Sequence, residues 1–469
     1  MHSSAKKNRR VLNVFVLAMF NASIMLSLRN LPLISEFGLG VIFYFFIVAL
    51  FFLIPCALIS AELASGWPKE GGVYIWVREG LGDRFGFLAI WMQWAHNLSW
   101  YPVILSFVAA TIAYIISPEL AKNKLFITSI ILIGFWGMTL LNYLGIKTSS
   151  WFSSLGVILG TIAPGLFIIA LGFAWMFSGN PIQAPISALA LLPDFSRISN
   201  IVFLAGLFLA FSGLEVSAAY AQDVKNPQKN YPRAILIAAL ITFAIFLLGS
   251  LAISFVIPKS EISLVTGLIE AFYSFFSHYN IEWVLPIMGV LLVIGAIAEV
   301  NAWIIGPVKG LHATSLHGNL PPVFQKVNKH DVPTNLLLFQ AIIVSIVSMI
   351  FLFMPNVSSA FWMLTAMSAQ SYLIMYVLMF IAAIRLRYTK PHVPRAYRVP
   401  HAKPGIWIFS CMGIFASIFA ILLGFVPPSQ LNVGNVYVYF FILLLGLLTM
   451  CAIPLIIHEF RKPGWIKKT

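Results

Sequence analysis

Charged side chains are scarce in this chain of 469 residues, because Asp, Glu, Lys and Arg make up only 9% of it while 60% of the residues are hydrophobic. A soluble domain cannot bury so much apolar surface, so the composition excludes a soluble protein and indicates a polytopic membrane protein. Negatively charged residues are fewer than positively charged ones, with 15 Asp and Glu against 29 Lys and Arg. The basic residues lie between apolar runs, where they set membrane topology, so the net charge of +14 does not indicate nucleic acid binding.

Cysteine is almost absent as well. Cys56, Cys411 and Cys451 each fall inside an apolar segment, with no CxxC or Cys/His spacing. We therefore expect neither a disulfide nor a metal site. The sequence also contains no nucleophile elbow and no Walker motif, and Gly71-Gly72 alone does not indicate phosphate binding. These absences argue against an enzyme, and we expect no cofactor.

Hydrophobic residues are gathered in runs long enough to cross a bilayer. Twelve such runs lie at about 11–34, 38–63, 84–116, 125–144, 149–177, 198–221, 233–257, 283–311, 334–354, 358–386, 405–426 and 434–458. An even number of crossings places both termini on one side of the membrane. Of the 29 Lys and Arg residues, 24 fall on that side, four fall on the other, and Arg29 falls inside the first run. Because Lys and Arg accumulate in cytoplasmic segments, we expect both termini to be cytoplasmic.

The sixth apolar run is interrupted near its middle. Ser212-Gly213 stands in an apolar segment, and Glu215 follows two residues later. Glycine lowers helix stability, and an ionised carboxylate at membrane depth costs about 2.5–3.5 kcal/mol on insertion scales. Together they predict a helix that breaks at mid-membrane and exposes backbone groups and a carboxyl group to a ligand. The alternative is a notch of small residues that packs against a neighbouring helix, beside a glutamate at the interface.

The first run carries a weaker signal of the same kind. It is crowded with polar residues before it ends at Pro32, namely Asn21, Ser23, Ser27, Arg29 and Asn30. Taken alone, such a segment is often an interfacial helix end. The first and sixth runs are five runs apart, however, and paired interruptions in corresponding places predict a transporter site at the interface of two repeats.

Several long motifs resemble those of one family of transporters. The loop after the second run reads AELASGWPKEGGVYIWVREGLGDRFGFLAIWMQW, and the loop after the sixth reads QDVKNPQKNYPRAI. Both are similar to signatures of the amino acid–polyamine–organocation superfamily. The segments SLRNLP and AEVNAWIIGPVKGLHATSLHGNLPP are similar to its glutamate/GABA antiporter branch. The resemblance covers essentially the whole chain.

This resemblance implies an all-α membrane protein with a leucine-transporter-like fold of 12 helices. Its expected parts are a cytoplasmic N-terminus at 1–10, a first five-helix repeat at 11–178, an inverted second repeat at 198–388, two further helices at 404–458 and a short cytoplasmic C-terminus at 459–469. With so few residues after the last helix, we expect no cytoplasmic plug of the kind found in the acid-resistance antiporter of this family. The basic N-terminus lacks a recognisable cleavage site, so we expect the first helix to be retained.

The same resemblance implies a secondary active amino acid transporter in a bacterial inner membrane, a monomer or homodimer that works by alternating access. Exchange of one amino acid for another is the expected mode. The alternatives are proton-coupled symport of a neutral amino acid, a transporter-like amino acid sensor, and a channel that shares the fold. The substrate is expected between the broken first and sixth helices and the third, eighth and tenth.

Glu215, Glu299 and Trp303 are the leading site residues. Glu215 matches the acidic position after the break of the sixth helix in this branch, where it would border the substrate and carry a proton. Glu299 and Trp303 are four residues apart, hence on one helical face. The resemblance implies that both face the transport path, Trp303 as a gate. Glu299, like Glu215, is a candidate for proton coupling. Structural carboxyl groups and a packed indole are the alternatives.

Two tyrosines and a histidine complete the candidates on the third and tenth helices. Tyr372 and Tyr376 repeat the spacing of four and match a pair that faces the path in this branch. His96 is a candidate for proton coupling because imidazole titrates near neutrality. For all three, the alternative is a hydrogen-bonded core residue.

The first helix departs from the wider superfamily. Met25-Leu26-Ser27 stands where many members have a glycine-containing element that binds the substrate carboxylate through its backbone. Ser23 and Ser27 remain candidates for substrate binding. Arg29 has two open interpretations: it helps to hold a carboxylate, or it extends outward or pairs with an acid.

Overall fold

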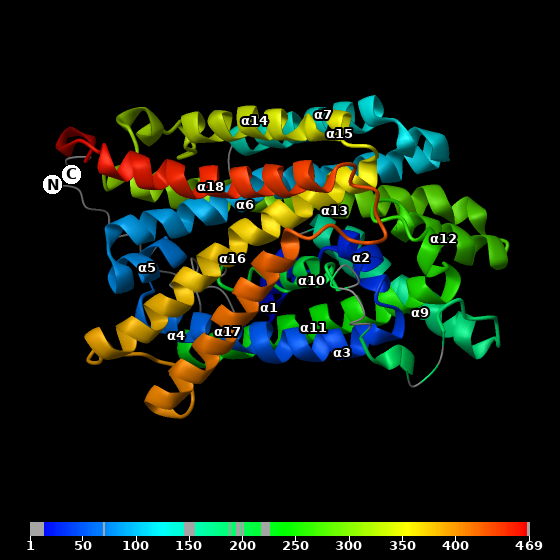
Figure 1. The fold of residues 1–469 in the computed structure, drawn as a ribbon, viewed down its shortest axis with the longest axis horizontal. Helices are drawn as coiled ribbons and strands as arrows, with labels where there is room; N and C mark the ends of the chain where they lie inside the picture. Colours follow the sequence, from blue (N-terminus) through cyan, green and yellow to red (C-terminus); the bar gives the residue numbers. More distant parts are fainter. Residues whose placement is uncertain are drawn as a thin grey trace.

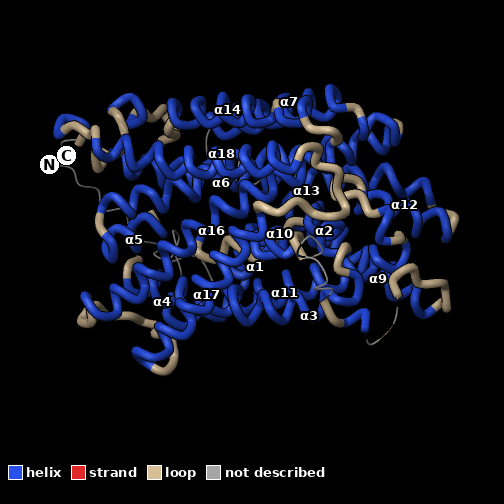
Figure 2. The backbone as a smooth tube through the Cα atoms, in the orientation of Figure 1, coloured by secondary structure: helices blue, strands red, loops and turns tan. Residues whose placement is uncertain are grey.

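The computed structural model describes residues 14–68, 71–144, 155–185, 187, 189–193, 198, 201–216 and 226–466. Every regular element in these ranges is helical, as Figure 2 shows. Long helices lie side by side along the longest axis of the molecule, and α16 (Val357–Thr389) crosses the bundle obliquely (Figure 1). The expectation of an all-α protein is confirmed for these residues.

Within the described ranges, ten helical segments are long and apolar enough to cross a membrane, and each overlaps one of the apolar runs identified in the sequence. They are Gly38–Gly66 (containing α3, Val41–Val48, and α4, Ile54–Gly66), α6 (Asp83–Ile116), α7 (Lys124–Tyr143), Leu155–Phe177 (containing α9, Ala163–Phe177), Arg233–Val256 of α11 (Pro227–Val256), Glu282–Leu316 (containing α13, Leu285–Leu316), Thr334–Phe353 (α14, Thr334–Ser348, and α15, Ile350–Phe353), α16, α17 (Ala402–Gly424) and α18 (Val436–Glu459).

The first and sixth runs form no long continuous helix in the described residues. Helix α1 (Val14–Met25) stops before Leu26, and helical structure resumes with η1 (Leu28–Asn30) and α2 (Leu31–Ser35). Helix α10 (Leu204–Ala210) stops before Phe211, and residues 217–225 lie outside the described part. Both interruptions fall where the polar residues of the sequence predicted them. The inverted repeat, the division into repeats and the count of twelve crossings stay predictions.

Helices α6 and α16 lie at the centre of the bundle. In their most apolar stretches 78% and 72% of the residues are buried, against 17% in α18 at the periphery. Besides the helices of the two interrupted runs, the described residues include two shorter α-helices outside these spans. They are α5 (Val73–Leu81), which packs on α6 and α16, and the amphipathic α12 (Gly267–His278), which buries one apolar face. The residues that α6 and α16 turn inward are therefore the ones placed to contact the interrupted helices.

Glycines bring the segment before α9 against α13. A Cβ atom added to Gly160 would lie 2.2 Å from the backbone nitrogen of Gly295, and one added to Gly156 would lie 2.4 Å from the Cβ of Ala298. Only small residues permit two helix backbones to approach so closely in a membrane. Gly295 lies one turn before Glu299 on α13. The close contact therefore fixes the part of α13 that carries Glu299 beside the interruption of the first helix.

Candidate functional site

The break after α10 is built around a glycine. Gly213 has φ = +110°, a backbone conformation that residues with a side chain rarely adopt. Its N–H group, which no longer bonds within a helix, donates to the hydroxyl of Tyr376 at 2.7 Å. The buried backbone group is thus satisfied by a side chain from α16, and the interruption is part of a defined hydrogen-bonded arrangement.

Glu215 lies at the end of this break and is 1% exposed. Its carboxylate accepts hydrogen bonds from Tyr372 Oη at 2.5 Å, from Tyr376 Oη, and from Gln93 Nε2 at 3.1 Å. Three donors from α6 and α16 therefore converge on one acid of the interrupted helix. This arrangement positions the break, because the carboxylate cannot move without losing partners from two other helices.

An aromatic layer adjoins this carboxylate. The His96 ring stacks on Tyr372 with ring centroids 4.1 Å apart, and Trp303 meets His96 edge-on at 5.7 Å. The Nδ1 of His96 lies 2.7 Å from Ser368 Oγ. Trp100 lies 5.8 Å from Trp303, ring centre to ring centre. The indole ring of Trp303 also borders the break, since a Cβ at Gly213 would lie 3.6 Å from it.

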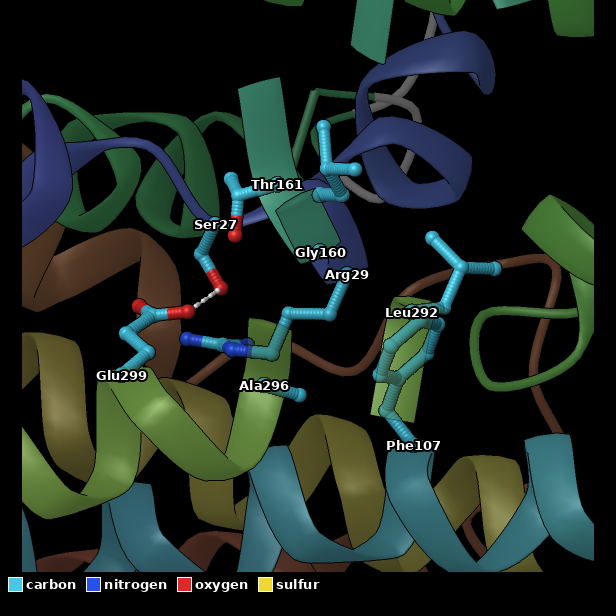
Figure 3. A pocket seen from close by; sticks show the side chains of 9 residues that line it. Ser27, Arg29, Phe107, Gly160, Thr161, Leu292, Ala296 and Glu299 are labelled. Carbon is cyan, nitrogen blue, oxygen red and sulfur yellow. Dashed lines mark hydrogen bonds between the residues drawn. The ribbon is translucent and has the colours of Figure 1, made fainter. Parts of the chain in front are cut away.

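A second polar group lies at the interruption of the first helix. Ser27 Oγ donates to Glu299 Oε2 at 2.7 Å, and Arg29 extends its guanidinium toward the same carboxylate (Figure 3). A small pocket opens here between η1, α6, α13 and the π-helical segment η5 (Ile158–Ile162). Glu299, Ser27 and Arg29 are each 3% exposed. Arg29 is therefore an interior residue that approaches an acid, and the interpretation that it extends outward to the membrane surface is wrong.

The structure brings most of the predicted site residues into two adjoining groups. Ser27 and Glu299 form one group, and Glu215, Tyr372, Tyr376 and His96 belong to the other. Trp303 is in contact with the second group and one helical turn from Glu299. Ser23 lies in α1, and its side chain is outside the part that the structure describes. The functional roles of these residues stay predictions.

Sequence reasoning missed Gln93, Trp100 and Ser368. Gln93 and Trp100 flank His96 by three and four positions, the spacing of one helical face, and this periodicity is the signal that would have found them. Ser368 stands one turn before Tyr372 on α16 for the same reason.

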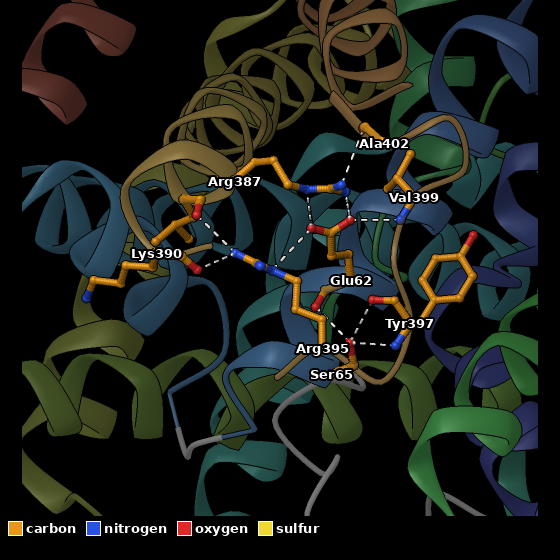
Figure 4. A network of polar contacts seen from close by, with 9 residues as sticks. Glu62, Ser65, Arg387, Lys390, Arg395, Tyr397, Val399 and Ala402 are labelled. Carbon is orange, nitrogen blue, oxygen red and sulfur yellow. Dashed lines mark hydrogen bonds and ion pairs between the residues drawn. The ribbon is translucent and has the colours of Figure 1, made fainter. Parts of the chain in front are cut away.

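The sequence also left unrecognised an ion cluster at one end of the bundle. Glu62, 3% exposed near the end of α4, forms ion pairs with Arg387 and with Arg395, the latter at 3.3 Å, and accepts the N–H of Val399 at 2.8 Å. Figure 4 shows the carboxylate between the two guanidinium groups. Glu62 therefore joins α4 to the end of α16 and to the segment after it.

No metal centre was expected, and no group of three or more His, Cys, Asp or Glu side chains suited to a metal ion occurs within the described ranges.

Comparison with known proteins gives matches along nearly the whole chain. The family model "Amino acid permease" matches residues 11–448. An uncharacterized transporter of Legionella pneumophila is 42% identical over 447 residues, 95% of this chain and 96% of its own length. A glutamate/gamma-aminobutyrate antiporter of Lactococcus lactis subsp. lactis is 30% identical over 458 residues, 96% of this chain and 91% of its own. A probable agmatine/putrescine antiporter of the same organism is 21% identical over 397 residues, 84% of this chain and 83% of its own.

Proposed function

This chain belongs to the amino acid permease family and is an amino acid transporter; we propose that it is an antiporter of the glutamate/GABA type that exchanges one amino acid for another. The observation that carries the proposal is the match to a glutamate/gamma-aminobutyrate antiporter across 96% of this chain. The match includes both interrupted helices and the helices that pack on them, so the proposal concerns the whole transport unit and not one motif.

The interior arrangement supports alternating access. Both interruptions are lined by buried polar groups. Such groups destabilise a membrane protein unless they are hydrogen-bonded, and they often serve to bind a substrate or an ion. Trp303 borders the break after α10 and lies one turn from Glu299. We assign it the role of a gate between the pocket beside Ser27 and the carboxylate of Glu215. Substrate passage then requires the indole to move and the two interruptions to rearrange.

The topology proposed with this function follows the distribution of Lys and Arg. We place both termini on the cytoplasmic side of a bacterial inner membrane, with the repeats 11–178 and 198–388 related by inversion. On this topology the cluster around Glu62 lies at the cytoplasmic end of α4 and α16.

Proton-coupled symport is the second candidate. The observation in its favour is the presence of two buried acids and a buried histidine in the candidate site, because such groups can carry protons. The third candidate, a sensor, would bind amino acids through the same groups without moving them.

Counterflow in proteoliposomes tests these candidates. Vesicles are loaded with one amino acid at a time, and entry of labelled glutamate is followed. An exchanger gives entry that depends on a specific internal amino acid, with little entry into empty vesicles. Entry into empty vesicles under an inward proton gradient would favour symport and contradict exchange. Binding without any entry would favour the sensor.

A further inference from the structure

We propose that Arg29 binds a carboxylate group of the transported substrate and that this contact excludes polyamines. The inference rests on the proposed transport function and names the substrate chemistry of the same site. Agmatine and putrescine carry positive groups and no carboxylate. A chain that uses Arg29 in this way transports carboxylate-bearing amino acids.

Arg29 is a buried cation with unused hydrogen-bonding capacity. Its side chain is 3% exposed and belongs to the short η1 segment directly after the first interruption. Within the described residues its Nε has no hydrogen-bond partner. A guanidinium offers five N–H donors and stays charged, so an unpartnered donor of a buried guanidinium is available to an anionic acceptor.

The aromatic side chains around Arg29 leave its donors free. The guanidinium carbon lies 5.6 Å from the ring centre of Trp100 and 6.0 Å from that of Phe361. Ring faces attract a cation but accept no strong hydrogen bonds in its plane. The two rings therefore hold the side chain in the interior while its N–H groups remain available to a ligand. Such a planar fork matches a carboxylate.

A second unsatisfied donor lies nearby. Trp303 Nε1 has no hydrogen-bond partner among the described residues, and its ring lies 5.8 Å from Trp100, the same ring on which Arg29 rests. Each of these two buried donors can pair with a carboxylate oxygen, whereas an ammonium offers them no lone pair. This independent observation indicates the same ligand chemistry as Arg29.

Glu299 offsets the charge of Arg29 in this structure without forming an ion pair with it. The two charges attract each other, but no nitrogen of Arg29 lies within 4.0 Å of a Glu299 oxygen. Ser27 holds the Glu299 carboxylate at 2.7 Å. A substrate carboxylate can therefore approach the guanidinium without first breaking a closed ion pair, and the small pocket beside these residues lies where it would enter (Figure 3).

Binding to the purified full-length protein in detergent tests the proposal. We would measure glutamate, GABA, putrescine and agmatine binding to wild type, R29Q, R29K and the double variant R29Q/E299Q. Loss of one charge-assisted pair is expected to weaken glutamate binding about 10- to 100-fold in R29Q. R29K keeps the charge but loses the planar fork, so its binding should be intermediate. The wild type should bind neither putrescine nor agmatine.

The double variant separates two roles of Arg29. If Arg29 only neutralises Glu299, removing both charges restores wild-type glutamate affinity, and that result would overturn the proposal. If Arg29 contacts the substrate, R29Q/E299Q still binds glutamate more weakly than wild type, because the guanidinium that holds the substrate carboxylate is missing. R84Q, which removes a half-exposed arginine on the first turn of α6, is the matched control and should bind like wild type.

Counterflow of the wild type keeps this inference distinct from the proposed function. A wild type that exchanges glutamate while R29Q and R29K bind it with unchanged affinity overturns the role of Arg29 alone. A wild type that binds putrescine as tightly as glutamate also overturns the role of Arg29 and leaves the proposed function intact. A wild type that neither binds nor exchanges any amino acid overturns the proposed function and this inference with it. If R29Q cannot be purified as monodisperse protein, the glutamate affinity of R29K tests the proposal in its place.

Discussion

Tyr376 supports Gly213 and Glu215 through one hydroxyl group, since it accepts the N–H of Gly213 at 2.7 Å and donates to the carboxylate two residues further on. The break after α10 is thus fixed to α16 at both its backbone and its acid. Tyr372 donates to the same carboxylate, whereas the Gly213 N–H is bonded to Tyr376.

The two tyrosines should therefore respond differently to the loss of a hydroxyl. Tyr376→Phe removes a donor and leaves a buried N–H unsatisfied, which costs about 1–3 kcal/mol. Tyr372→Phe removes only a donor to Glu215. We expect Tyr376→Phe to lower the thermal unfolding midpoint more than Tyr372→Phe does, and to reduce counterflow more strongly. Equal effects of the two variants on stability and transport would contradict the assigned role of Tyr376.

Trp303 is expected to be essential for transport and dispensable for folding. Trp303→Ala removes the ring that borders Gly213 and His96, and with it the proposed gate. We expect counterflow to fall at least about tenfold, while size-exclusion chromatography shows an unchanged monodisperse peak. The variant should also unfold at a lower temperature, because truncating a buried aromatic side chain costs about 3–5 kcal/mol. Trp303→Phe is the control that keeps a ring and should retain part of the activity. Near-normal exchange in Trp303→Ala would remove this residue from the site.

The ion cluster around Glu62 offers a test of stability with an internal control. Glu62→Gln leaves the guanidinium groups of Arg387 and Arg395 buried without their shared counter-charge. Breaking a buried pair in this way costs about 3–5 kcal/mol. The same substitution at Glu119, whose ion pair with Lys122 is almost fully exposed, should change stability by less than about 1 kcal/mol. Comparable melting temperatures for the two variants would show that the buried cluster contributes little.

The ten long apolar helices could be predicted from the sequence because hydrophobic length alone distinguishes a membrane-spanning segment. The interruptions were predictable for a related reason, since Gly213 and the polar residues before Pro32 have no favourable place in a continuous membrane helix. Helix ends were less certain: α13 continues to Leu316, whereas the sequence ended this run at about 311.

Partners distant in sequence could not be predicted. Glu62 and Arg387 are 325 residues apart, and nothing in the local pattern of either indicates the other. Periodicity states which residues share a helical face but not which face of another helix they meet. For this reason Gln93, which donates to Glu215 from α6, was missed, and the direction of Arg29 was left open.

The burial of the Glu36 carboxyl group predicts that the stability of the folded protein depends on pH. It follows α2 at the end of the first helix, outside the membrane-spanning segments, and is 3% exposed with one carboxylate oxygen that has no hydrogen-bond partner in the described residues. Burial raises the pKa of this carboxyl to about 7, and the positive charge of Lys259 limits the rise. The folded protein therefore binds this proton more tightly than the unfolded chain does.

The sign of the effect follows from this difference. Glu36 contributes its full stabilisation below the pKa of the unfolded chain, about 4.5, and this contribution is lost as the pH rises through about 7. The loss is at most about 3 kcal/mol. We expect the melting temperature of the wild type to fall between pH 5 and pH 8 and that of Glu36→Gln to fall less, because the amide stays neutral. Glu261→Gln, at an exposed position in η9 (Lys259–Glu261), should keep the wild-type slope. If Glu36→Gln also keeps that slope, the proton of Glu36 does not stabilise the fold, and the carboxyl must be charged in the native protein at both pH values.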